Sequence, residues 1–179
     1  MNAWDELRRH ITDKAIVHER VVLSSGREAD YYIDLRRITL DGAAAPLVGQ
    51  VMLDLAEDLN IEAVGGLTLG ADPVAASMLH AAHAHGRPLD AFVVRKDEKQ
   101  HGLRRRIEGP EVTGRRVLAV EDTSTTGASV LTAVDALTEA GAHVVAVAVI
   151  VDRDTGAREH VEKRGLEYRA AYHKGDLGL

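Results

Sequence analysis

Residues 121–127 are the part of the sequence with the clearest capacity for chemistry. After the apolar residues 117–120 come two acids, four consecutive hydroxyl residues and a glycine: Glu121, Asp122, Thr123, Ser124, Thr125, Thr126 and Gly127. Successive backbone N–H groups at the entrance of a helix bind anions, and the helix dipole strengthens that binding. Hydroxyl groups add donors, and a glycine lets the backbone approach an anion closely. The stretch therefore predicts a cradle for a phosphate group.

The two acids in front of this cradle need a partner other than phosphate, because carboxylates repel it. Sugar hydroxyls, which donate hydrogen bonds to carboxylates, or a metal ion would supply one. A strand, two acids, a hydroxyl-rich cradle and a helix together predict a site for a ribose phosphate. The alternative is an ordinary helix cap with two solvated acids, although a cap does not require four consecutive hydroxyl residues.

A basic segment over residues 95–106 is the second candidate for chemistry. It holds six basic and two acidic residues, a net charge of +4 in a chain whose net charge is −6. It opens a polar stretch to residue 114 that lacks the period of a helix or a strand, so we expect a long loop. Lys99 and His101 in this loop could meet negative charge that develops on a leaving group. The alternatives are a solvated charged loop and a patch that binds nucleic acid.

Composition excludes several other classes of protein. With no cysteine, the chain has no disulfide, thiolate metal site or thiol nucleophile. The longest apolar run, Val144–Val151, is too short to span a membrane as a helix, and the acidic N-terminus lacks a signal peptide, so we expect a cytoplasmic protein without membrane contact. A net charge of −6 and 3% aromatic residues do not favour nucleic-acid binding. The fingerprints of P-loop and dinucleotide-binding enzymes are also absent from the sequence.

The elements that must position these residues alternate between two periods. Strand patterns occupy residues 61–64, 91–94, 117–120, 144–151 and 167–171, and helix patterns occupy residues 47–59, 72–85, 130–141 and 155–164. We expect Gly65 and Gly66 to break the first of these strands, and Asp72 and Pro73 to start the helix that follows. Before residue 43 the sequence predicts a helix capped by Asn2 and two short strands. This order is typical of an α/β sheet with right-handed crossovers.

Ligands of an open α/β sheet bind beyond the carboxyl ends of its strands. Three such ends carry unusual residues, over residues 65–72, 121–127 and 152–154. We therefore expect the chemistry of the protein at these strand ends, and residues 121–127 are the most informative of them. Three histidines at His80, His83 and His85 have no carboxylate or cysteine at ligand spacing, which favours a helix surface over a metal site.

Several motifs resemble those of a known family. Residues 117–129 resemble the phosphoribosyl pyrophosphate (PRPP) motif of the type I phosphoribosyltransferases, and residues 95–102 resemble the mobile catalytic loop of the orotate-specific members. Residues 31–36 and 65–73 also resemble those members. The similarity runs from about Ser24 to Arg153, which is most of the chain.

This resemblance implies a fold and a reaction. The fold is a single phosphoribosyltransferase domain over residues 1–179, with a mostly parallel central sheet flanked by helices and a small N-terminal region on the substrate side. The reaction is that of PRPP with orotate to give orotidine monophosphate and pyrophosphate, a step of pyrimidine biosynthesis. It implies Mg²⁺ as cofactor, bound mainly through the pyrophosphate rather than directly by side chains. It also implies a homodimer in which the basic loop of one subunit reaches the site of the other.

The resemblance assigns roles to individual residues. Lys99, His101 and Asp122 are the implied catalytic residues, and Thr125 and Arg153 are placed near orotate. A guanidinium matches the orotate carboxylate with two parallel hydrogen bonds. The implied PRPP site comprises Arg95, Lys96, Lys99, His101, Glu121, Asp122, Thr123, Ser124, Thr125, Thr126, Gly127, Ala128 and Ser129, with the acids facing the ribose hydroxyls and residues 123–127 holding the 5-phosphate.

Two departures and two alternatives accompany the resemblance. Ser24 and Leu69-Gly70 stand where members of the family often carry lysines, so we expect the pyrophosphate to depend more on residues 95–101. A purine-specific transferase is one alternative, but it would not need Arg153 for a carboxylate. A non-catalytic regulator of the same fold is the other, but it would not need Lys99 and His101.

Overall fold

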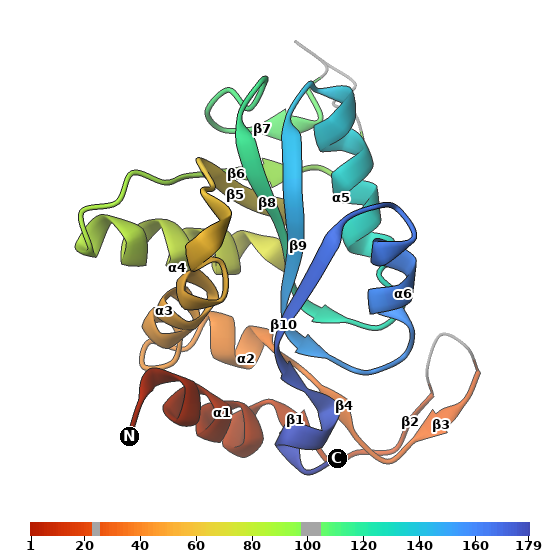
Figure 1. The fold of residues 1–179 in the computed structure, drawn as a ribbon. Coiled ribbons are helices and arrows are strands. Elements are labelled where there is room, and N and C mark those ends of the chain that lie inside the picture. The colour runs from red at the N-terminus through yellow and green to blue at the C-terminus, as the bar shows by residue number, and fades with distance from the viewer. Residues whose placement is uncertain (23–25, 98–104) are drawn as a thin grey trace.

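The computed structural model describes residues 1–22, 26–97 and 105–179, and a six-stranded sheet lies at its centre (Figure 1). The strands are β5 (Ala63–Leu67), β6 (Asp90–Val94), β7 (Ile107–Glu108), β8 (Arg116–Ser124), β9 (His143–Asp152) and β10 (Glu167–His173). Their order across the sheet is β10-β9-β8-β5-β6-β7, and only the β6–β7 pair is antiparallel. The predicted α/β fold with a mostly parallel sheet is confirmed.

Helices cover both faces of this sheet. Figure 1 shows α3 (Ala45–Leu55) and α4 (Ala71–Ala84) on one face, and α5 (Ala128–Glu139) and α6 (Ala157–Glu162) on the other. Two apolar cores result, one around Met52 and Met78, the other around Leu137 and Val149. Strand β9 is buried from both sides, as its uninterrupted apolar run predicts. Among the described residues, no helix has the length and hydropathy needed to cross a membrane.

The N-terminal region forms small elements beside the sheet. Helix α1 (Ala3–Lys14) begins at Asn2, whose side chain accepts a hydrogen bond of 2.8 Å from the Asp5 N–H, as predicted. Two small antiparallel ladders follow, and a short helix leads into α3. These elements are β1 (Ile16–Val17) with β4 (Tyr32–Ile33), β2 (Val21–Val22) with β3 (Glu28–Ala29), and α2 (Arg36–Thr39).

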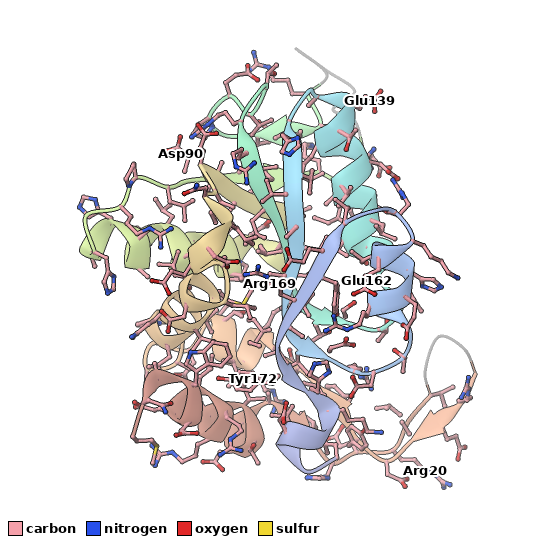
Figure 2. The ribbon with its side chains drawn as sticks, in the orientation of Figure 1. Arg20, Asp90, Glu139, Glu162, Arg169 and Tyr172 are labelled. Carbon is pink, nitrogen blue, oxygen red and sulfur yellow. The ribbon has the colours of Figure 1, made fainter. Side chains whose placement is uncertain are left out.

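Strand β10 holds α1 and α3 in place against the sheet. The Tyr172 hydroxyl donates to the Trp4 carbonyl at 2.7 Å, and the two rings meet edge to face. Arg169 donates to the Leu55 carbonyl at the end of α3 and pairs with Asp58 in the 3₁₀ turn Glu57–Leu59. Figure 2 labels Arg169 and Tyr172 along β10. These contacts fix the N-terminal region relative to the sheet.

The sequence prediction was wrong about the two glycines of the first core strand. Strand β5 continues through Gly65 and Gly66 to Leu67. A Cβ atom at Gly65 would overlap the backbone of Phe92, and one at Gly66 would overlap the carbonyl of Val120. The glycines therefore allow neighbouring strands and α4 to approach closely rather than ending the strand.

Three other boundaries differ from the prediction. Helix α4 begins at Ala71 with Gly70 as its N-cap, so Asp72 and Pro73 lie inside its first turn. The stretch expected to be a loop after residue 95 contains β7, which pairs with β6. Strand β8 continues through Ser124, because its pairing with β9 extends from Arg116 to Ser124. The acids and the first two hydroxyl residues of the cradle are thus held by a rigid strand.

Candidate active site

Three segments meet at the carboxyl edge of the sheet, because parallel strands end at the same edge. Strand β5 leads into residues 68–70, β8 leads into residues 125–127, and β9 leads into residues 153–156. Ser124 at the end of β8 is paired with Asp152 at the end of β9. The three segments singled out in the sequence therefore lie together at the edge where ligands of such sheets bind.

The predicted cradle lies between β8 and α5. A small cavity of about 50 Å³ is lined by residues 121 and 123–130. Gly127 has a φ of +84° and forms the N-cap of α5, so its lack of a side chain is what allows the chain to turn there. The amide N–H groups of Thr125, Thr126 and Gly127 donate to no protein acceptor among the described residues. Their orientation at a helix entrance suits an anion such as phosphate.

The segment after β5 covers the two acids. A Cβ atom at Gly70 would lie less than 3.0 Å from Glu121 Oε1 and from Asp122 Oδ1, so a larger residue would require these carboxyl groups to move. The segment is fixed at Thr68, whose N–H donates to the Val94 carbonyl at 2.8 Å and whose hydroxyl donates to Asp72 at 2.7 Å. The sequence prediction treated Gly70 as a missing lysine and did not identify this contact.

The acids form an electrostatically strained pair. Glu121 is only 8% exposed, and burial raises the pKa of its carboxyl to about 8, with further contributions from Asp122 and Asp72. Neither Glu121 nor Asp122 has an ion pair with a basic residue in the described part of the chain. Hydroxyl donors or a cation would relieve this repulsion, which is the chemistry expected of a sugar and of Mg²⁺.

The segment after β9 brings Arg153 to the other side of the cradle. The Arg153 N–H donates to the Ser124 carbonyl at 3.0 Å. Arg153 as a residue is partly exposed, and its guanidinium has no ion pair among residues 1–22, 26–97 and 105–179, so it is available to an anionic ligand. The preceding residue, Asp152, is buried and accepts a hydrogen bond from the Asp154 N–H. Arg153 thus projects from a segment whose backbone is fixed on both sides.

The fold places polar groups of β10, which the sequence prediction missed, beside the segment 152–154 that it singled out. One ligand atom each from Asp152, Asp154 and His173 lie within 4.8 Å of one another, a spacing that a metal ion could use. His173 Nδ1 lies 2.7 Å from Asp154 Oδ1, so a hydrogen bond already explains two of the three positions. The Tyr168 hydroxyl is buried nearby, and burial raises its pKa. Tyr168 and His173 lie on β10, and no local motif marks them.

The predicted basic residues are only partly described. Lys99 and His101 lie outside the described residues, as does Ser24. Arg95 and Lys96 follow β6, but the Arg95 guanidinium lies 3.7 Å from Glu108 on β7. Arg106 donates to the backbone carbonyls of Arg95 and Lys96. In the described contacts, Arg95 is therefore engaged with the β6–β7 hairpin rather than with the acids.

Comparison with known proteins identifies relatives of the whole chain. The phosphoribosyl transferase domain family matches residues 48–171. An orotate phosphoribosyltransferase of Streptomyces avermitilis is 71% identical over 97% of this chain and 96% of its own length. A crystal structure of the Mycobacterium tuberculosis orotate phosphoribosyltransferase in complex with PRPP is 52% identical, with a TM-score of 0.87 over 99% of this chain and all of its own. The same enzyme in complex with Fe(III) dicitrate gives 57% identity and a TM-score of 0.91, at the same coverage.

The buried Glu121 gives a testable pH dependence. Because burial raises the pKa of Glu121 to about 8, we expect the folded protein to keep this proton up to about pH 8, whereas the unfolded chain releases it near pH 4.5. The free energy of unfolding should therefore fall as the pH rises from about 5 to 8, by at most about 1.4 kcal/mol per pH unit from this group. Thermal melts of the substrate-free protein across this range measure it. Glu121→Gln should flatten the slope, and an unchanged slope would show that Glu121 is ionised in the fold.

Proposed function

The chain belongs to the orotate phosphoribosyltransferase family, and we propose that Glu121, Asp122 and the cradle of residues 123–127 are its PRPP site. The reaction transfers ribose 5-phosphate from PRPP to orotate, giving orotidine 5-monophosphate and pyrophosphate. The observation that carries the assignment of the site is the placement of two carboxyl groups, which pair with no basic residue in the described part of the chain, ahead of a helix entrance. A sugar phosphate is the ligand that offers hydroxyl groups to the two acids and an anionic phosphate to the helix entrance.

Each part of this site has a distinct task. The 5-phosphate would accept hydrogen bonds from the backbone N–H groups and hydroxyls of residues 123–127, with Ala128 and Ser129 completing the first turn of α5. The ribose 2- and 3-hydroxyls would donate to Glu121 and Asp122. Because these carboxylates stand beside the sugar, they also stabilise the positive charge that develops on it as the bond to pyrophosphate breaks.

Orotate would bind on the β9 side of the cradle. Its carboxylate suits the partly exposed guanidinium of Arg153, and Thr125 adds a hydroxyl between the two substrates. Neither a purine-specific transferase nor a non-catalytic regulator is favoured, because the curated relatives named above carry the orotate name at high identity. Lys99 and His101, with Arg95 and Lys96, would meet the charge of the departing pyrophosphate.

The donor set at β8 fits magnesium. Carboxylates are ligands that Mg²⁺ prefers, and it usually combines one or two of them with substrate phosphates and water. Glu121 and Asp122 would be the nearest protein groups, while the pyrophosphate would supply most of the ligands. When bound, the ion neutralises negative charge on the leaving group. We propose in addition a cytoplasmic enzyme of one domain, residues 1–179, which acts as a homodimer.

Asp122→Asn tests the ribose assignment. The variant keeps the shape of the side chain but removes the charge that faces the sugar, so kcat should fall by about 10²-fold or more. The fall in orotate absorbance on addition of PRPP and Mg²⁺ measures the activity. Glu139→Gln, on the exposed end of α5, is the matched control and should behave as wild type. Near-normal activity of folded Asp122→Asn would contradict the assignment.

Arg153→Ala separates recognition of orotate from recognition of PRPP. A charge-assisted hydrogen bond contributes about 1.5–3 kcal/mol, so the orotate KM should rise roughly ten- to a hundredfold. The KM for PRPP should change far less, because PRPP has no carboxylate. Arg153→Lys keeps the charge but lacks the planar guanidinium, so its orotate KM should lie between those of wild type and Arg153→Ala. Equal weakening of both substrates would mean that Arg153 supports the fold instead.

Subunit exchange tests the shared site. Lys99→Ala and Asp122→Asn chains, each inactive alone, are mixed and allowed to exchange. If Lys99 of one subunit acts in the site of the other, a mixed dimer has one intact site and one doubly damaged site. Random pairing makes about half of the dimers mixed, so activity should recover to roughly a quarter of wild type. If mixed dimers form and no activity returns, Lys99 acts within its own chain.

A further inference from the structure

Two side chains from beyond β9 hold the backbone of the cradle from outside. The Thr155 hydroxyl donates to the Thr125 carbonyl at 2.5 Å. His160 Nδ1 lies 2.7 Å from the Thr126 carbonyl, and since a carbonyl oxygen only accepts, Nδ1 carries the proton. The two donors are 30 and 34 residues away from their acceptors along the chain. Neither the sequence motifs nor the proposed mechanism gives them a role.

The planarity of the peptide bond converts these contacts into control of the cradle. A trans peptide unit directs its carbonyl and its N–H to opposite sides. The carbonyl of Thr125 belongs to the same unit as the N–H of Thr126, and the carbonyl of Thr126 belongs to the same unit as the N–H of Gly127. Fixing the two carbonyls outward therefore fixes the two N–H groups toward the cavity. These are two of the donors that the phosphate would use.

The apolar packing of α6 does not depend on either donor. Helix α6 is anchored in the core by Ala157 and Val161, which are 1% and 0% exposed. Thr155 and His160 are both exposed, so the Thr155 methyl group and the His160 ring contribute little to that core. The Gly127 turn also lies against α6, because a Cβ atom at Gly127 would lie 3.4 Å from the Ala157 carbonyl. The hydrogen bonds thus act on a cradle that α6 already contacts.

We propose that Thr155 and His160 are positioning residues that orient the N–H groups of the phosphate cradle. The inference rests on the proposed function, because it requires that the cradle binds the 5-phosphate. It also gives the β9 segment two tasks: Arg153 faces orotate, while Thr155 two residues later aligns the site for PRPP. A displaced carbonyl at Thr125 or Thr126 would turn an acceptor oxygen toward the phosphate and repel it.

Matched pairs of variants separate the hydrogen bonds from packing. Thr155→Val removes the hydroxyl and keeps the shape, whereas Thr155→Ser keeps the hydroxyl. His160→Leu removes the donor, whereas His160→Asn retains an N–H near the position of Nδ1. Titration calorimetry with ribose 5-phosphate measures the cradle alone, and steady-state kinetics give the KM values for PRPP and orotate. Thermal melts report whether each variant is folded.

The donor-less variants should weaken the cradle selectively. We expect Thr155→Val and His160→Leu each to raise the Kd of ribose 5-phosphate and the KM of PRPP about three- to tenfold, the range of one net hydrogen bond. Thr155→Ser and His160→Asn should stay near wild type, and the orotate KM and the Tm should change little in all four variants.

Three results would overturn the inference in distinguishable ways. Wild-type binding by Thr155→Val and His160→Leu would show that the carbonyls need no outside donor. Equal losses in Thr155→Ser and His160→Asn would show that packing is responsible. If the wild-type protein itself does not bind ribose 5-phosphate, the cradle assignment under the proposed function fails, and the positioning role fails with it.

Discussion

The carboxyl edge of the sheet depends on one constraint: two neighbouring carboxyl groups, one of them buried, that cannot both be charged at low cost, so that Glu121 holds its proton in the free protein. Glu121 is buried at the end of β8 with Asp122 beside it, and no basic residue of the described chain pairs with either. Such a pair lowers the free energy of unfolding of the substrate-free protein, so the surrounding structure must keep the two side chains in place. Strand pairing with β9 fixes the backbone beneath the acids, and the side-chain-free Gly70 gives the carboxylates room above. The site is thus prepared for a ligand that brings hydroxyl groups and a cation.

The body of the sheet explains how the protein tolerates two adjacent acids, Glu121 and Asp122, at its carboxyl edge. Strands β8 and β9 are fixed by packing on both faces, since Leu118 and Ile150 are fully buried in one core and Ala119 and Val149 in the other. Polar atoms that remain buried near the site, including Ser124 Oγ and Asp72 Oδ1, have no protein partner among the described residues. Stability therefore comes from the body of the sheet, while its carboxyl edge is adapted to the ligand instead.

The fold class and the cradle could be predicted because their signals are local. A continuous apolar run indicates a central parallel strand, and acids followed by hydroxyl residues and Gly127 indicate an anion site at a helix entrance. Contacts between distant segments could not be predicted. The sequence alone predicts that Gly65 and Gly66 end a strand. Only the structure shows that β6 and β8 lie too close to these positions for a side chain. Thr155, His160, Tyr168 and His173 have no motif, since each acquires its environment only when β9 and β10 join the sheet.

The contact between Tyr172 and Trp4 joins residues that are 168 positions apart. Helix α1 buries Leu7 and Ile11 against the core, and its Trp4 contacts both α3, through Asp54, and β10, through Tyr172. Helix α1 is synthesised long before β10, so this packing cannot be completed until residues 167–173 have left the ribosome. Contacts of such long range also slow folding, because a large loop must close before they form. Until β10 is added, Trp4 lacks both the ring and the hydroxyl donor that Tyr172 supplies.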